Sequence, residues 1–220
     1  MSTNYVNNLA LVRDLFQGEE EHQLAIRSVS DEDILTDDFD SGRLLNYHLK
    51  QITEKWLSDR FLWLACSEAK KTHERAIIGL LMHVDRHMFI NLNRIIVVDD
   101  ENNIEEACAA INADAEEWPS CIDFDNCNTL GCYWWSQSCV VINMKAINQS
   151  LDALQKEYET DGLYFDRCKE EWIGFATTLL HELRHLGLSN PYLDCALYPS
   201  DLESESAVEQ WALEQFERAG

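Results

Sequence analysis

Two histidines and a glutamate in the stretch His181-Glu182-Leu183-Arg184-His185 have the types and the spacing to bind and use a metal ion. On an α-helix, residues four apart are separated by only about 40° around the axis, so both imidazoles can point at one cation. Glu182 lies beside them, where a carboxylate can take a proton from a metal-bound water. The motif therefore predicts a zinc-binding helix in which Glu182 is the catalytic base.

The residues around the motif agree with a helix that has one buried face. On a helical wheel, four apolar residues fall within about 40° of the side opposite His181. They are Trp172, Ala176, Leu183 and Leu186. On the histidine side, the small residues Gly174 and Thr178 would leave space for a substrate or an incoming metal. Gly187 would supply a C-cap, and Ser189-Asn190-Pro191 cannot readily prolong the helix.

A zinc ion that does chemistry usually takes three protein ligands, so the chain must supply one more. Residues 201–216 read as a second helix. Its buried side is predicted to carry Ala207 or Val208, Trp211, and Gln215 or Phe216. We expect Glu205 to bind the zinc and Glu209, one turn later, to orient a ligand histidine by accepting a hydrogen bond from its outer nitrogen. Glu203 and Glu209 are the competing third ligands, and a solvated acidic face is the alternative for all three.

A resemblance to a known family rests on these residues. HExxH followed by a glutamate on a later helix resembles the gluzincin group of zinc metallopeptidases, whose architecture is thermolysin-like in broad terms. Within that group, Glu205-x-x-Val208-Glu209-x-Trp211-Ala212 is similar to the Glu-x-x-Ala-Asn/Asp-x-Phe-Ala helix of the ImmA/IrrE-type peptidases, with departures at Val208 and Glu209. The resemblance covers about residues 170–216. It implies an α+β, zincin-like fold: a mixed β-sheet with an HExxH active-site helix and a C-terminal glutamate-bearing helix.

The activity that the resemblance implies is zinc-dependent hydrolysis of peptide bonds in a protein or peptide substrate. Glu182 would accept a proton from the metal-bound water and pass it to the leaving amine. Tyr192 and Tyr198, between the two helices, are candidates for stabilising the oxyanion. Two other functions stay open. One is a metal-bound but inactive protein-interaction module with a basic partner. The other is an acetyltransferase-like module, suggested by a β-α-β-β-β order over residues 23–98 that lacks a Gly-rich turn after its last strand.

Composition narrows the class of protein. With 220 residues, 46% of them hydrophobic, the chain can bury one substantial core, so we expect a single domain over 1–220, with an N-terminal α/β part (1–100) and a catalytic part (101–220). Its 40 acidic against 17 basic residues give a net charge of −23, which disfavours nucleic acid and anionic lipid as partners. The N-terminus has no signal-peptide pattern, and no apolar run approaches about eighteen residues. We expect a cytoplasmic protein without membrane segments, although export without a signal stays open.

Two further groups of residues could bind metal. Four of the eight cysteines, Cys121, Cys127, Cys132 and Cys139, lie within nineteen positions, but no pair has the two-residue separation of a zinc knuckle. The even count could mean disulfides, yet without a secretory signal we expect free thiols. The stretch 83–87 would place His83, Asp85 and His87 on one face if it were extended. It is either a second metal site or an exposed strand end with a His-Asp contact.

The remaining pattern gives the elements that must position the motif. We expect helices over 5–16, 44–57, 102–113 and 151–159, the last capped by Ser150. We expect strands over 23–29, 61–66, 76–84 and 89–98, loops over 30–41 and 114–131, and a turn at Asp161-Gly162. Tyr133-Trp134-Trp135 and the run 139–143 indicate a hairpin. Its apolar strand either holds an extended peptide by strand addition or is an ordinary core strand.

Overall fold

A mixed four-stranded β-sheet forms the centre of the part of the chain that the computed structural model describes, which is residues 49–65, 67–188 and 204–219. The strands are β1 (Phe61–Trp63), β2 (Arg94–Val98), β3 (Gly131–Trp134) and β4 (Cys139–Asn143), in the order β1-β2-β4-β3. β1, β2 and β4 run parallel, whereas β3 is antiparallel to β4 and lies at an edge. Together with its helices, the sheet makes the α+β fold that the sequence predicts.

Helices connect and cover these strands. They are α5 (Glu54–Ser58), α6 (Ser67–Leu81), α7 (Asn103–Ala110), α8 (Met144–Thr160), α9 (Arg167–Leu188) and α10 (Glu205–Ala219). Short 3-10 turns span Arg86–Phe89, Ala115–Glu117 and Trp135–Gln137. The side chains of Thr53, Asn143 and Ser204 cap the starts of α5, α8 and α10, because each accepts a hydrogen bond from a backbone N–H of the first turn.

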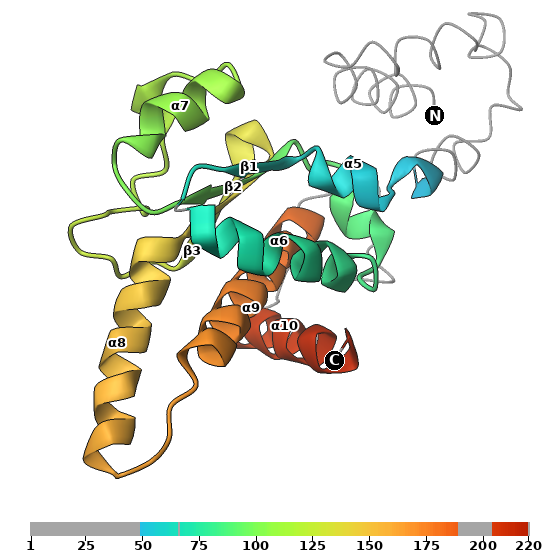
Figure 1. Ribbon diagram of the computed structural model, residues 1–220. Coiled ribbons are helices and arrows are strands. Elements are labelled where there is room, and N and C mark those ends of the chain that lie inside the picture. Colours follow the sequence, from blue (N-terminus) through green and yellow to red (C-terminus); the bar gives the residue numbers. More distant parts are fainter. Residues whose placement is uncertain (1–48, 66, 189–203, 220) are drawn as a thin grey trace, which may run out of the picture. The chain divides into compact units, whose positions relative to one another are not determined.

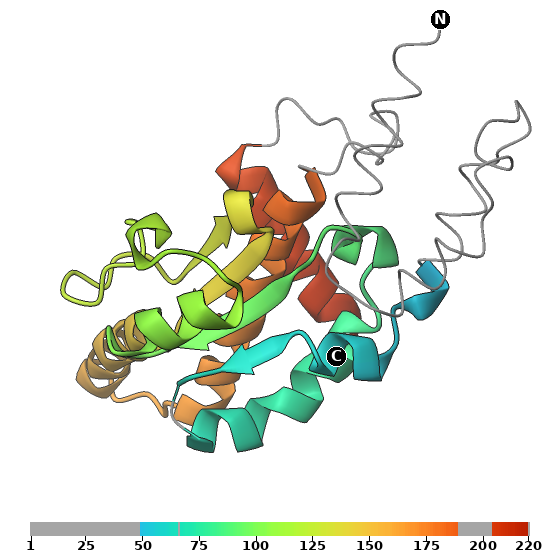
Figure 2. The ribbon, with the colours of Figure 1, turned by 90° about the horizontal axis from the view of Figure 1, so that it is seen from above.

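The two central strands are apolar along almost their whole length because both of their faces are covered. Ile95 and Val97 of β2 belong to a core shared with α6, α8 and α9. Ile96 and Val98 point the other way, into a smaller core with α7. Figure 1 shows α7 above the sheet and α6, α8 and α9 below it, and Figure 2 looks down on the α7 side. The sheet therefore separates two apolar layers.

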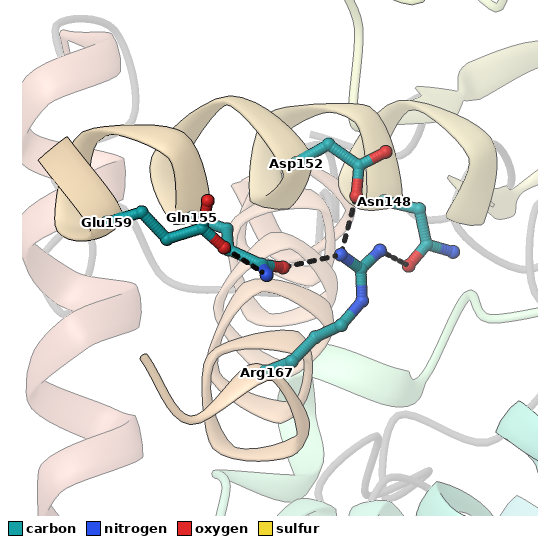
Figure 3. Close-up of polar contacts among 5 residues, drawn as sticks. All are labelled: Asn148, Asp152, Gln155, Glu159 and Arg167. Atoms are coloured by element: carbon teal, nitrogen blue, oxygen red, sulfur yellow. Dashed lines mark hydrogen bonds and ion pairs between the residues drawn. The ribbon is translucent and has the colours of Figure 1, made fainter. Parts of the chain in front are cut away.

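Polar contacts fix the first half of α9. Arg167, the first residue of α9, donates to Asp152 of α8 at 2.5 Å and to Asn148 and Gln155 of the same helix at 3.4 Å each, as Figure 3 shows. One turn further on, Glu171 bonds the Nε2 atom of buried His73 on α6 at 2.9 Å. These contacts orient α9 between α6 and α8.

Several predicted elements are confirmed. The helix predicted over 102–113 is α7, and the predicted hairpin is the antiparallel pair of β3 and β4. The region 114–131 has no regular structure beyond one 3-10 turn and the first residue of β3. The turn at Asp161-Gly162 follows α8, with Gly162 in the left-handed region at a φ of 69°.

One predicted strand is wrong. The region 76–84 contains the end of α6 and the turn after it. Its buried residues Ile77, Leu81 and Val84 recur at spacings of four and three, which is the period of a helix. The many branched apolar side chains suggested a strand, but the burial follows the helical period.

Other predicted elements have different bounds. Only 94–98 of the strand predicted over 89–98 is β2, and only 61–63 of the strand predicted over 61–66 is β1. The helix expected over 151–159 is α8, which begins at Met144 because Asn143, rather than Ser150, caps it. The helix expected over 44–57 is interrupted within its described part, because Thr53 is extended and caps α5.

The described residues belong to one compact unit of the chain, Leu49–Gly220. The elements predicted over 5–16, 23–29 and 30–41 lie outside the described residues. A single domain over 1–220 therefore stays a prediction. Among the helices of the described segments, none has the length and apolar character needed to span a bilayer.

Candidate metal centre

Three of the predicted ligands converge at the contact between α9 and α10. The Nε2 atoms of His181 and His185 lie 3.0 Å apart. Glu205, the first residue of α10, places its Oε2 atom 3.2 Å from Nε2 of His181 and 3.6 Å from Nε2 of His185. This group of three side chains could hold a metal ion.

The separations match what a small tetrahedral cation requires. A metal with ligand bonds of about 2.0–2.1 Å and tetrahedral angles holds its ligand atoms about 3.3 Å apart. The three observed separations of 3.0, 3.2 and 3.6 Å lie around that value. The Glu205 side chain is 79% exposed, so the group faces solvent. The donor set of two imidazoles and one carboxylate is one that catalytic zinc uses.

Burial, more than charge, favours the metal-binding form of His181. The pKa of His181 is lowered, first by burial and then by the neighbouring His185, while the Glu205 carboxylate acts in the opposite direction. A lowered pKa keeps the imidazole neutral, which is the form that binds a metal. The charge of Glu209 also raises the pKa of His181, so this carboxylate acts on the group, and its predicted hydrogen bond to a ligand histidine stays a prediction.

Apolar packing explains why α10 brings Glu205 to the histidines. Val208 and Ala212 of α10 are buried, which settles the choice between Ala207 and Val208, because Ala207 is exposed. Two contacts to aromatic rings join the two helices at their sides. The Arg184 guanidinium lies 5.2 Å from the centre of the Trp211 ring, and the Trp172 and Phe216 ring centres are 6.2 Å apart. Ser204 caps α10, so the helix begins at the ligand itself.

The buried face of α9 is wider than the sequence predicts. Of the predicted residues, Ala176, Leu183 and Leu186 are fully buried, and Trp172 is half-buried. Three more residues share that face: Phe175, Leu179 and Leu180. This broad contact with the sheet leaves His181 and His185 half-buried on the remaining side of the helix.

Glu182 lies beside the metal group, in a buried position. Its side chain is largely enclosed, with the residue 8% exposed, and its carboxylate accepts a hydrogen bond from the backbone N–H of Tyr133 on β3. Burial, followed by the charge of Glu205, raises the pKa of Glu182 to about 7, against the effect of the Tyr133 hydrogen bond. A carboxylate with a pKa near neutral can both accept and return a proton.

Tyr133 and Gly131 of β3, which sequence reasoning missed, hold Glu182. The carbonyl of Leu130, just before β3, points to β4, because it accepts from the Asn143 N–H at 2.8 Å. Backbone groups alternate in direction along an antiparallel strand, so the N–H of Tyr133, three residues later, points away from β4. Gly131 allows the close approach, because a Cβ there would lie 2.7 Å from Cγ2 of Thr178 and 3.1 Å from Cγ of Glu182. A glycine at the start of a strand is the sequence signal that could have found this contact.

One prediction about the small residues of α9 needs correction. Gly187 is not a C-cap, because α9 continues to Leu188. The absence of a side chain there lets Met88 pack closely, since a Cβ on Gly187 would lie 2.2 Å from its Sδ atom. Gly174 and Thr178 are half-buried, with a single atom of Ile147 within 4 Å of a Cβ on Gly174, so the space expected beside them stays a prediction.

Other candidates are settled or lie outside the described residues. In the stretch 83–87, Asp85 bonds His87 through Nδ1 at 2.7 Å and through its backbone N–H at 3.0 Å, which confirms the His-Asp contact, although in a 3-10 turn rather than a strand. Among the described residues, no metal-ligating group of three includes these histidines. Glu203, Tyr192 and Tyr198 lie outside the described residues, so their predicted roles stay predictions.

The fold and the site together define an α+β protein with a His-His-Glu group that could hold a metal ion. Comparisons with family models, with curated proteins and with solved structures found no match to this chain. A functional assignment therefore has to be argued from the geometry of the site.

Proposed function

We propose that this chain is a zinc-dependent metallopeptidase of the gluzincin type, with a zincin-like fold, that hydrolyses peptide bonds in a protein or peptide substrate. The observation that supports this most is the convergence of His181, His185 and Glu205 beside a buried, strand-anchored Glu182. Two histidines on one helix, a glutamate on a later helix and an adjacent acid are the parts that such an enzyme needs.

The donor set supports zinc as the metal. Two imidazole nitrogens and one carboxylate oxygen suit a borderline-soft cation, whereas magnesium and calcium prefer oxygen ligands. When bound, zinc supplies a Lewis acid that polarises a carbonyl group and lowers the pKa of water toward about 7. The half-buried histidines and the exposed Glu205 leave the group open to solvent on one side.

In this proposal Glu182 moves the proton. Its carboxylate takes a proton from the attacking water and delivers it to the leaving amine. The hydrogen bond from Tyr133 holds one position of the carboxylate, and burial keeps bulk water away from it. A pKa of about 7 suits both halves of this transfer near neutral pH.

The position of β3 supports a peptide as the substrate. β4 lies between β2 and β3, so it is an interior core strand and has no edge to offer. β3 is the edge strand and runs beside α9, next to Glu182. An extended peptide could add to the part of that edge that Glu182 does not occupy, and this would bring its backbone toward His181, His185 and Glu205.

A metal measurement and one conservative substitution test the proposal. The full chain, saturated with zinc and dialysed, should retain about one equivalent, and it should cleave members of a peptide library or a denatured proteome. Glu182→Gln should keep the zinc and abolish cleavage, while Glu217→Gln, at an exposed position of α10, should keep both. Full cleavage by the Glu182→Gln protein would overturn the mechanism. Zinc retention without cleavage of any substrate by the wild type would favour the protein-interaction module.

A further inference from the structure

Two of the free thiols, those of Cys121 and Cys132, are joined by a hydrogen bond on the side of β3 that faces α7. Cys132 of β3 pairs with Val141 of β4, whose side chain belongs to the α7 core, so Cys132 points to that side of the sheet. Its thiol is hydrogen-bonded to the thiol of Cys121, an exposed residue in the loop that precedes β3. Contact between two thiols is the arrangement from which a disulfide forms with little backbone movement.

The loop that carries Cys121 is fixed in place by apolar side chains. Ile122 and Phe124 are buried in the α7 core, and the rings of Trp118 and Trp134 meet edge to face with centres 5.6 Å apart. These anchors lie on both sides of Cys121, so they hold its sulfur against Cys132.

The other two cysteines between positions 121 and 139 make hydrogen bonds to backbone carbonyls instead of to a thiol. The Cys127 thiol donates to the Phe124 carbonyl at 3.0 Å, and the Cys139 thiol donates to the Gln137 carbonyl at 3.3 Å. Both residues are buried, and burial raises the pKa of Cys139 to about 12. Because these two thiols bond carbonyls rather than another thiol, Cys121 and Cys132 stand apart as the hydrogen-bonded thiol pair, with one exposed member.

We propose that Cys121 and Cys132 are an oxidation site that closes an intrachain disulfide and ties the loop to the edge strand β3. With a peroxide as the oxidant, the exposed Cys121 thiolate attacks one peroxide oxygen, which gives a sulfenic acid at Cys121 and hydroxide. The Cys132 sulfur then attacks the Cys121 sulfur, the S–S bond forms, and the sulfenic oxygen leaves as water with the Cys132 proton. Overall, two thiols lose two electrons and two protons, and hydrogen peroxide is reduced to two waters.

The surroundings of the pair assign these roles. Burial, then the hydrogen bond and charge of Cys121, and finally the charge of Glu182, raise the pKa of Cys132 well above its ordinary value. Exposed Cys121 therefore meets the oxidant first, and Cys132 keeps its proton until the second step, when it attacks as the resolving thiol and gives that proton to the departing sulfenic oxygen. The disulfide would close a short loop in the unfolded chain and so stabilise the folded one.

Mass spectrometry of the full chain, treated with hydrogen peroxide and then alkylated under denaturing conditions, tests the proposal. Cys66 and Cys195 are replaced by Ser throughout, because they lie outside the described residues. We expect loss of two hydrogens and two fewer alkylated thiols than in the reduced chain. Trypsin cannot locate the bond, since no Lys or Arg lies between Arg94 and Lys145, so the chain is cut before Asp123 and Asp125. The peptides that carry Cys121 and Cys132 should then be linked until a reductant is added.

Substitutions and a melting curve complete the test. Cys121→Ser should abolish the linkage, whereas Cys127→Ser and Cys168→Ser, the latter at an exposed position of α9, should keep it. Oxidation should raise the Tm by roughly 5–10 °C in every variant that forms the link. Full alkylation of both thiols after peroxide, overoxidation of Cys121 without a link, or a link to another cysteine would each overturn the proposal. These measurements need neither metal nor cleavage, so their failure is separate from failure of the proposed function.

Discussion

The backbone N–H of Tyr133 donates a hydrogen bond to the carboxylate of Glu182, and this contact joins the edge of the sheet to the helix that carries the metal group. It depends on the antiparallel register of β3, which turns that N–H away from β4. The position of Glu182 is therefore set by two elements far apart in the chain. The predictions that follow separate the contribution of each part of this arrangement.

If the group binds zinc as proposed, removal of either histidine should weaken zinc binding strongly. His181→Ala and His185→Ala should each weaken zinc binding by more than about a hundredfold, since loss of an outer-shell partner alone costs 10–100-fold. His83→Ala is the matched control, because His83 is exposed and belongs to no metal-ligating group of three among the described residues. Competition titration with a zinc chelator measures all three. Equal affinities for the His181 and His83 variants would exclude the site.

Substitution of the three candidate glutamates should weaken zinc affinity to different degrees. Glu205→Gln should weaken zinc as strongly as loss of a histidine, because its Oε2 atom lies within 3.2 and 3.6 Å of the two Nε2 atoms. Glu209→Gln should weaken zinc by about 10–100-fold, as expected for an outer carboxylate. Glu203→Gln should leave the affinity unchanged. The same titration orders the three, and a larger loss from Glu203 than from Glu205 would show that the third ligand is wrongly assigned.

A methyl group at Gly131 should strain the contact between β3 and α9. Gly131→Ala should lower the free energy of unfolding by roughly 1–3 kcal/mol, since the new Cβ would meet Cγ2 of Thr178 at 2.7 Å. Thr178→Ser removes that methyl group and should restore part of the loss in the double variant. Urea unfolding measures both. Gly79→Ala is the control. Gly79 lies in helix α6, and a Cβ there would meet no atom within 4 Å. This substitution should leave the free energy of unfolding unchanged or raise it by up to about 1 kcal/mol.

The metal-free protein should lose stability as the pH rises toward neutral. Burial and the charge of Glu205 raise the pKa of Glu182 from 4.5 to about 7, so the folded state favours the protonated form. The resulting stabilisation is present in full below pH 4.5 and is lost as the pH rises through about 7. At about 1.36 kcal/mol per pKa unit, the change amounts to about 3 kcal/mol.

Glu182→Gln isolates the contribution of Glu182 to this pH dependence. The amide side chain does not titrate, yet its oxygen can still accept the hydrogen bond from the Tyr133 N–H. In a chelator-containing buffer, the wild type should lose stability relative to this variant between pH 4.5 and about 7. Urea unfolding at a series of pH values gives the difference. A difference that is constant over this range would mean that Glu182 is not the group that titrates.

Local sequence patterns predict the parts of the site that one helix can build. Because side chains four residues apart share a face of an α-helix, HExxH fixes the relation of His181, His185 and Glu182 wherever the helix lies. For residues 76–84, residue type misled: the branched apolar side chains indicate a strand, although their spacing is that of the helix α6. Residue type also gave Gly187 the role of a C-cap, because the sequence does not show that Met88 packs against it.

The sequence by itself determined that His181, His185 and Glu182 share one face of a helix and that Glu205 lies on a later helix, since both follow from residue types and their period along single helices. The α+β class followed from the resemblance that these residues carry. Only the tertiary structure decided that Glu205 reaches both histidines, that Tyr133 holds Glu182 and that Cys121 touches Cys132. Each of these contacts joins residues from different elements. Their distances are set by the packing of α10 on α9 and by the register of β3 on β4, which no periodicity within a single segment encodes.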